Sequence, residues 1–385
     1  MKKILSVTGN RADYDLMSYL YRKLNADPEI DLQLVVTGAH LTAGYASSLD
    51  EMRRDGCAIA ACIENILASD SPASRIKSMS IFLNDFIQVI SRVMPDVILC
   101  VGDREEVPAI ALAAAYLKIP CVHFFGGDYV ADGHVDNLAR SAASVLSTVH
   151  IVSLEEHKRR LMAMGEEERR IFAIGSIALD KFREEPMVGR DTLMERMGRP
   201  DWREYALVIY HPPTEITGEN PEIANILKLL KERGTNAFVS YPNTDFNHSG
   251  VEKAFAPYLS DGQFCFYRNL DRNTFINLYR HAFFQIGNSS AGIVESASIP
   301  LPVINVGSRQ RSRKAQENVL FVSGGYADIA RALDTVESAA FRARVAGLRN
   351  LYGDGRSSET AYQILKDTDF RELLLKTHDP LEVQA

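Results

Sequence analysis

Val97-Ile98-Leu99-Cys100-Val101-Gly102-Asp103-Arg104 is the stretch that decides the fold of this 385-residue chain. Five apolar residues without alternation are typical of a strand that is buried on both faces, and the glycine-led polar break marks its end. A helical pattern follows at residues 107–117. Strand, break and helix in this order indicate one unit of a parallel α/β sheet.

The same rhythm extends outward in both directions. In the first half, further apolar runs lie at residues 4–7, 32–36, 121–125 and 149–152, and further helical patterns lie at 16–24, 81–93 and 137–146. After a junction at 175–203, whose part 181–198 is charged and poorly periodic, runs return at 207–210, 237–240, 283–286 and 303–306. We therefore predict an α/β chain with two doubly wound Rossmann-type domains, 1–175 and 176–357, in a GT-B-like arrangement facing a central cleft. Residues 358–385, with a helical pattern at 358–376, are expected to pack back on the first domain.

Composition excludes several classes of function. Apolar residues make up 46% of the chain, and the formal net charge of −7 argues against a broad nucleic-acid-binding face, although a local basic pocket stays compatible. No stretch approaches the ~20 apolar residues of a membrane span, and the run at 4–7 is too short for a signal peptide. The five cysteines show no CxxC spacing, which favours reduced thiols over metal ligands or disulfides and predicts a cytoplasmic location.

The segment Gly287-Asn288-Ser289-Ser290-Ala291-Gly292-Ile293-Val294-Glu295 follows an apolar run and is predicted to open a helix. Small side chains let backbone N–H groups approach a phosphate, and a helix N-terminus adds partial positive charge. Ser289 and Ser290 can add hydroxyl donors, and Glu295 can accept hydrogen bonds from two ribose hydroxyls. The alternative is a tight strand–helix turn that a serine caps.

Basic residues supply a second anion-binding pattern. Directly after the run at 303–306 the chain carries Arg309, Arg311, Arg313 and Lys314. Such clusters are commonly solvated surface charge, but at the carboxyl end of a strand they are also suited to pair with a diphosphate. Arg11, in the first polar break, is either a nucleotide contact or part of a structural ion pair.

Carboxylates gather after two runs of the first half. This set, with one histidine and one arginine among it, consists of Asp103, Glu105, Glu106, Asp128, Asp132, His134, Asp136 and Arg140. Crowded carboxyl groups suit acid–base catalysis, a hard-cation site, or helix caps and loop hydrogen bonds, and all three stay open. His211, which precedes two prolines, is either structural or directed into the predicted cleft.

Taken together, these stretches resemble the UDP-N-acetylglucosamine 2-epimerase family, and more closely its hydrolysing branch, which feeds sialic and legionaminic acid synthesis. The resemblance runs in order from about residue 3 to residue 320. It rests on the segments 8–14 (Thr-Gly-Asn-Arg-Ala-Asp-Tyr), 36–41 (Val-Thr-Gly-Ala-His-Leu), 102–104, 126–128, Asp136 with Arg140, His211-Pro212, 287–295 and 304–310 (Ile-Asn-Val-Gly-Ser-Arg-Gln).

The resemblance implies a GT-B fold and the hydrolytic 2-epimerisation of UDP-N-acetylglucosamine or a related 2-acetamido sugar nucleotide. A carboxylate would remove the proton from C2 while UDP leaves C1, and water would add to the 2-acetamidoglucal to release a free N-acetylmannosamine-type sugar. Asp103, Asp128 and Asp136 would carry the proton transfers, and His211 would assist near the diphosphate. The substrate would be held by Arg11, His134, Arg140, Leu270, Ser289, Ser290, Gly292, Glu295 and Arg309. We predict no cofactor, metal ligand, nucleic-acid partner or membrane partner, and the resemblance implies a homodimer or homotetramer, because relatives commonly form them.

Two positions depart from the family pattern. The usual Gly-Gly-Glu is Gly126-Gly127-Asp128 here, and a carboxylate displaced by roughly an ångström can lose about a hundredfold in rate. The usual histidine after the arginine is Ser141, which cannot act as a charged acid or base near pH 7. Either His134 replaces the missing imidazole, or the pocket accepts a modified sugar or another nucleotide.

Other functions stay compatible with the sequence: a non-hydrolysing 2-epimerase, a GT-B glycosyltransferase, and a non-catalytic sugar-nucleotide sensor. Many such transferases carry a basic, aromatic-rich helix for membrane docking, and no strong candidate for one is present, which disfavours that class.

Overall fold

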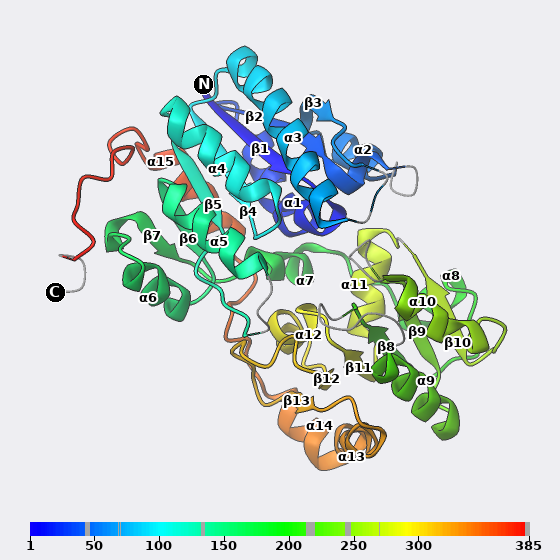
Figure 1. Cartoon of the computed structure of the whole chain (residues 1–385). Helices are drawn as coiled ribbons and strands as arrows, with labels where there is room; N and C mark the ends of the chain where they lie inside the picture. The colour runs from blue at the N-terminus through cyan, green and yellow to red at the C-terminus, as the bar shows by residue number, and fades with distance from the viewer. Residues whose placement is uncertain are drawn as a thin grey trace. The chain divides into compact units, whose positions relative to one another are not determined.

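The computed structural model describes residues 1–42, 47–67, 69, 71–131, 135–212, 220–242, 248–268 and 270–381. The chain forms two compact units, which are described separately below (Figure 1). The first comprises Met1–Tyr129, His134–Asp180 and Gly355–Ala385, and the second comprises Val130–Gly133 and Lys181–Asp354. Within the described residues, no helix is both long enough and apolar enough to span a bilayer.

The first unit is built on a parallel sheet that has seven strands in the described residues, in the order β3-β2-β1-β4-β5-β6-β7. The strands are β1 (Lys2–Thr8), β2 (Ile30–Thr37), β3 (Ala58–Ile63), β4 (Val97–Val101), β5 (Cys121–Phe124), β6 (Val149–Val152) and β7 (Ile171–Ala173). The strand order reverses between β1 and β4. In open α/β sheets, ligands bind outside the carboxyl ends of the strands at such a reversal.

Helices cover both faces of this sheet. They are α1 (Arg11–Ala26), α2 (Ser47–Arg54), α3 (Pro72–Val93), α4 (Glu106–Leu117), α5 (Val135–Leu146), α6 (Glu155–Ala163) and α15 (Ser357–Asp367). Alternate residues of β1 enter different cores: Ile4 packs with α1 and α15, whereas Leu5 packs with α3 and α4. The last helix, α15, lies against α1.

The second unit repeats this architecture. Its parallel sheet has six strands in the described residues, in the order β10-β9-β8-β11-β12-β13, with the reversal between β8 and β11. The strands are β8 (Ala206–Ile209), β9 (Ala237–Ser240), β10 (Phe264–Tyr267), β11 (Phe284–Gly287), β12 (Val303–Val306) and β13 (Val319–Val322). The helices from the inter-unit junction onward are α7 (Asp180–Glu184), α8 (Arg190–Arg196), α9 (Pro221–Arg233), α10 (His248–Phe255), α11 (Arg272–Arg280), α12 (Ala291–Val294), α13 (Tyr326–Glu337) and α14 (Ala339–Ala346).

The prediction of two doubly wound sheets is confirmed, and nine strands lie where the apolar runs predicted them. Four strands, β3, β7, β10 and β13, were not predicted, and each forms an edge of its sheet. All four are short runs of apolar residues, so the pattern that predicted the interior strands was also present in them and the prediction missed it. In β3, only Ile63 is fully buried.

Several predicted boundaries were wrong; the helix predicted at 81–93, for example, begins at Pro72. β5 ends at Phe124 rather than 125, because Phe125 leaves the strand with a φ of +65°. The charged part of the junction, 181–198, contains α8 and most of α7. The last helix ends at Asp367 and not at 376.

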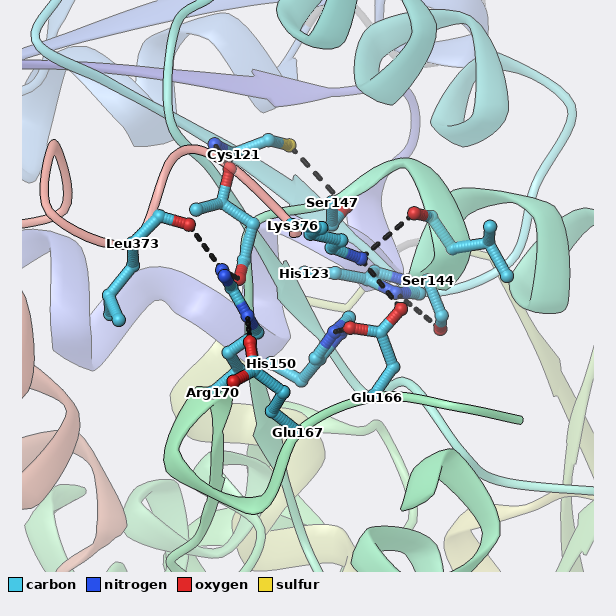
Figure 2. Close-up of polar contacts among 12 residues, drawn as sticks. Cys121, His123, Ser144, Ser147, His150, Glu166, Glu167, Arg170, Leu373 and Lys376 are labelled. Atoms are coloured by element: carbon cyan, nitrogen blue, oxygen red, sulfur yellow. Dashed lines mark hydrogen bonds and ion pairs between the residues drawn. The ribbon is translucent and has the colours of Figure 1, made fainter. Parts of the chain in front are cut away.

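After α15, buried polar side chains fasten the chain to the first unit (Figure 2). Arg170, only 1% exposed, donates a hydrogen bond to the carbonyl of Leu373. Lys376 pairs with Glu166 at 2.6 Å and donates to the carbonyl of Val145, in the last turn of α5, at 2.9 Å. The positive charge of Lys376 also interacts favourably with the partial negative charge at the C-terminal end of α5.

Candidate functional site

In the first unit, the loops after β1 and β4 are packed together at the sheet reversal. Asn10 caps α1: its Oδ1 accepts from the Asp13 N–H at 3.0 Å, and its Nδ2 donates to the Asp13 carboxylate at 2.9 Å. Gly9 admits the carboxylate of Glu106, since a Cβ at Gly9 would lie 2.0 Å from Oε1 of Glu106. A residue with any side chain at position 9 would therefore displace the Glu106 carboxylate from its place beside the first loop.

Two carboxyl groups in this loop pair hold their protons unusually tightly. Burial raises the pKa of Asp13 to about 7, and the nearby Glu106 adds to the effect while Arg104 opposes it. Burial also raises the pKa of Glu106. A raised pKa of Asp13 could not be predicted from the sequence, because Arg104 and Glu106, which surround Asp13, lie about 90 residues away in the chain.

This perturbation predicts a pH dependence of stability. The pKa of Asp13 in the folded chain, about 7, exceeds the value of about 3.9 expected when unfolded. The stabilisation from its proton is therefore complete below pH 4 and is lost as the pH rises towards 7. We expect the melting temperature of the wild type to fall relative to that of Asp13→Asn between pH 5 and pH 8. Parallel melting profiles for the two proteins would contradict this assignment.

Arg140 gathers the polar ends of two neighbouring strands. Its buried guanidinium forms an ion pair with Asp103, in the turn after β4. The same group donates to the backbone carbonyl of Asp128, after β5, at 3.0 Å, and to Oδ1 of Asn137 at 3.1 Å. One side chain of α5 thus fixes both carboxylate-bearing loops, as the planar donor fork of arginine allows.

The carboxylate of Asp128 has its own support. Its Oδ1 accepts from the Tyr129 N–H at 2.9 Å and lies 3.6 Å from Nε2 of His157. The preceding Gly127 has a φ of +71°, and a Cβ there would lie 2.3 Å from the carbonyl oxygen of His157. Only glycine permits this approach of the loop to α6.

The remaining predicted residues of the first unit are placed as follows. Arg11 lies in the first turn of α1 and forms an ion pair with Glu51 at 3.8 Å. Asp136 lies in the first turn of α5, one turn before Arg140, and Ser141 is partly buried beside it. His134 is outside the described residues. We name Asp13, Asp103, Glu106, Asp128 and Arg140 the carboxylate site.

In the second unit, Asn288 ties the turn after β11 to two other strand ends. Its Oδ1 accepts from the His211 N–H at 2.8 Å, and its Nδ2 donates to the His211 carbonyl at 2.8 Å. Its own carbonyl accepts from Gln310 Nε2, after β12, at 3.3 Å. Arg309 precedes Gln310 and is partly buried. We name His211, 287–295, Arg309 and Gln310 the turn site.

The serine-rich turn differs from the sequence expectation in two respects. α12 is a single turn, Ala291–Val294, so its dipole is small and an anion here would depend on individual N–H and hydroxyl groups. Glu295 is buried and ion-paired with Lys181 at 3.0 Å. Lys181 is more than a hundred residues away in sequence, which is why this pairing was not predicted.

The other predicted residues of the turn also have local roles. Ser289 is almost buried and its Oγ accepts from the Ala291 N–H at 3.3 Å, whereas Ser290 is exposed. A Cβ at Gly292 would lie 3.0 Å from Cγ1 of Val303, so Gly292 packs on the sheet. Leu270 packs at the edge of an apolar core on one face of this sheet.

Gly287 is the position at which the turn site depends most on glycine. Its φ is +144°, and a Cβ there would lie 2.0 Å from the carbonyl oxygen of Ile209. We expect Gly287→Ala to destabilise the fold by about 3 kcal/mol, as strain and overlap must both be relieved. Thermal unfolding measures this, with Gly347→Ala as the matched control because nothing lies within 4 Å of its Cβ position. Equal melting temperatures for the two variants would contradict the expectation.

In the described part of the chain, no group of three or more His, Cys, Asp and Glu side chains is placed to hold a metal ion. Asp132 and His134, two members of the cluster for which a hard-cation site stayed open, lie outside that part.

Comparison with known proteins gives matches over nearly the whole chain. The profile of the family described as UDP-N-acetylglucosamine 2-epimerase matches residues 22–366. A protein of Legionella pneumophila named UDP-N,N'-diacetylbacillosamine 2-epimerase (hydrolyzing) is 35% identical, over 97% of this chain and 98% of its own. One of Campylobacter jejuni, named GDP/UDP-N,N'-diacetylbacillosamine 2-epimerase (hydrolyzing), is 30% identical over 89% of each.

Among solved structures, UDP-GlcNAc 2-epimerase from Neisseria meningitidis, bound to UDP-GlcNAc, superposes with a TM-score of 0.80 at 19% identity. The match covers 95% of this chain and 100% of that one. The predicted GT-B-like fold class is thereby confirmed.

Proposed function

The chain belongs to the UDP-N-acetylglucosamine 2-epimerase family and is a sugar-nucleotide 2-epimerase, and from this premise we propose that it acts by the hydrolysing route on a UDP-linked 2-acetamido sugar. The observation that carries the proposal is the carboxylate site, in which Arg140 holds the loops of Asp103 and Asp128 together. Two carboxylates on adjacent strand ends can serve the two faces of one sugar carbon.

The proposed reaction has two stages. In the first, a carboxylate takes the proton from C2, the C1–O bond breaks with its electrons going to UDP, and a C1=C2 double bond forms. In the second, water adds its hydroxyl at C1 while a carboxylic acid returns a proton to C2 from the opposite face. Asp103 is held as a carboxylate in an ion pair, which is the form that accepts a proton. Asp128 and Asp136 are the proposed partners for the return.

The turn site is proposed to hold the nucleotide. The Asn288 side chain accepts from the His211 backbone N–H, and the Asn288 carbonyl accepts from the Gln310 side chain, which joins three strand ends without using the His211 ring. Arg309 and the Ser290 hydroxyl are the proposed contacts to phosphate. Glu295, charge-balanced by Lys181, keeps a carboxylate for the ribose hydroxyls.

For the sugar, we propose a diacetamido substrate of the N,N'-diacetylbacillosamine type in preference to N-acetylglucosamine. The names of the Legionella and Campylobacter relatives support this choice. The shorter Asp128 and the small Ser141 also leave more room beside Arg140 than the usual glutamate and histidine would.

The experiment is NMR of the reaction in D₂O with the UDP-linked diacetamido sugar, UDP-N-acetylglucosamine and a GDP-linked analogue. We expect UDP and a free, 2-epimerised sugar with one deuterium at C2, at the highest rate for the diacetamido substrate. A stable UDP-linked epimer would place the chain in the non-hydrolysing branch. Release of UDP only with an added acceptor would indicate a glycosyltransferase, and no turnover on the panel would reject the proposal.

A further inference from the structure

His123 lies fully buried on β5, beneath the turn that carries Asp103. Its Nε2 is 2.8 Å from the backbone carbonyl of Gly102, and its Nδ1 is 3.0 Å from the hydroxyl of Ser144 on α5. A carbonyl can only accept, so Nε2 carries the proton and Nδ1 accepts from Ser144. Burial lowers the pKa of His123 to about 4, so the ring is neutral at physiological pH and this tautomer persists.

Gly102 is held on both sides by β5. Its N–H donates to the Phe124 carbonyl at 3.1 Å, and its carbonyl accepts from His123. Its φ of +79° makes the sharp turn out of β4, directly before Asp103. The orientation of this one peptide therefore decides where the Asp103 carboxylate emerges.

The same helix face of α5 serves both contacts. Arg140 and Ser144 are one turn apart, so that Arg140 reaches Asp103 while Ser144 holds His123. The loop after β5 packs closely against Ser144 and His123. A Cβ at Gly126, in this loop, would lie 3.0 Å from Oγ of Ser144 and 3.1 Å from Nδ1 of His123.

From this geometry we propose that His123 is a positioning residue, which, oriented by Ser144, fixes the Gly102 carbonyl and so presents the Asp103 carboxylate to the sugar. The proposal rests on the proposed function, because it gives His123 its role through Asp103. His123 touches no substrate and moves no proton. Its contribution is to the geometry of the reacting group, where an error of about 1 Å can cost about a hundredfold in rate.

His150 provides a matched control. It is equally buried, on the adjacent strand, at the position paired with His123, and the two rings are 6.5 Å apart. Its Nε2 pairs with Glu166 at 3.1 Å, on the side of the C-terminal segment (Figure 2). Substitution of either histidine removes a buried imidazole from the same sheet. Of the two, His123 is the one that donates a hydrogen bond to the Gly102 carbonyl.

The test compares His123→Leu, His123→Gln, Ser144→Ala and His150→Leu for kcat, KM, UDP binding and thermal unfolding. We expect His123→Leu to lower kcat at least about tenfold while KM and the Kd for UDP change by less than about threefold. Gln can return a donor N–H to the Nε2 position, so His123→Gln should recover most of kcat. Ser144→Ala, the milder variant, should lower kcat in the same direction. His150→Leu should lower the melting temperature and leave kcat within about threefold.

Hydrogen exchange of the 102–106 segment gives a readout that does not need turnover. Faster exchange in His123→Leu than in His150→Leu supports the proposal, because a loosened turn exposes its amides more often. Equal losses of kcat in the two Leu variants, unchanged kcat in both His123→Leu and Ser144→Ala, or unchanged exchange of this segment in His123→Leu, would overturn it. If the wild type turns over no sugar nucleotide, the proposed function fails, and the exchange comparison still decides whether His123 fixes the turn.

Discussion

Asp103→Asn is expected to lower kcat by about a thousandfold, within the range typical for removal of a general acid or base. The amide cannot take a proton from carbon, so both the elimination and its deuterium label at C2 should disappear together. The fold should persist, because the amide oxygen can still accept from the Arg140 guanidinium, which the carboxylate pairs with in the wild type. Turnover by NMR, with UDP binding measured in parallel, tests this.

The matched control for this prediction is Glu105→Gln. Glu105 is two residues further along the same turn and pairs with Arg75 of α3 at 2.7 Å. The substitution removes a negative charge from the same loop without touching the Asp103–Arg140 pair, so kcat should stay within about threefold. If Asp103→Asn keeps more than about a tenth of the wild-type kcat, the proton transfer belongs to another group.

The fold was largely predictable because its interior strands are continuous apolar runs, each followed by glycine or polar residues. Val97–Val101, Val149–Val152, Ala237–Ser240 and Val303–Val306 were predicted to the residue, and all of their residues except Ser240 are buried. The edge strands β3, β10 and β13 are also apolar throughout and were missed, so the prediction of strands was incomplete at the sheet edges although the signal was present. Phe125 misled the prediction because an apolar side chain says nothing about its positive φ.

The sequence analysis named several residues that the structure places together, but it did not predict which of them contact one another. Asp103, Asp128 and Arg140 were each expected, and the structure joins Asp103 and Arg140 in one ion pair. Their catalytic roles stay predictions. What the sequence could not reveal are pairings that only folding creates, such as Glu295 with Lys181. His123 was equally hidden, because within a strand it has the pattern of an ordinary core residue.

Arg140→Leu is expected to cost both stability and activity. The Arg140 side chain is only 4% exposed, so its replacement leaves Asp103 and the Asp128 carbonyl without this donor. Loss of one member of a buried ion pair costs about 3–5 kcal/mol, and the lower end applies because the Asp103 side chain is 28% exposed and water can reach it. We also expect kcat to fall at least about a hundredfold, since both carboxylate loops lose their common anchor.

Arg140→Lys separates charge from geometry. Lysine keeps the positive charge, but a single ammonium cannot reproduce the planar fork that serves Asp103, the Asp128 carbonyl and Asn137 at once. Stability should therefore recover more than kcat does. As a surface control, Arg371→Leu removes a side chain that is 78% exposed and pairs with Asp96 at 3.2 Å, and should change stability by less than about 0.5 kcal/mol.

The combination of Arg140→Leu with Asp103→Asn tests whether the two residues act as one unit. Once Asp103 is neutral, removal of Arg140 no longer leaves a carboxylate without its counter-charge, so the second substitution should destabilise less than it does alone. A coupling of about 1–3 kcal/mol is expected from urea unfolding of the four proteins, the range for residues in direct contact. The kcat of the double variant should equal that of Asp103→Asn, because Arg140 no longer contributes once the side chain that it positions cannot take up a proton. Strictly additive losses would mean that Arg140 acts through Asp128 and not through Asp103.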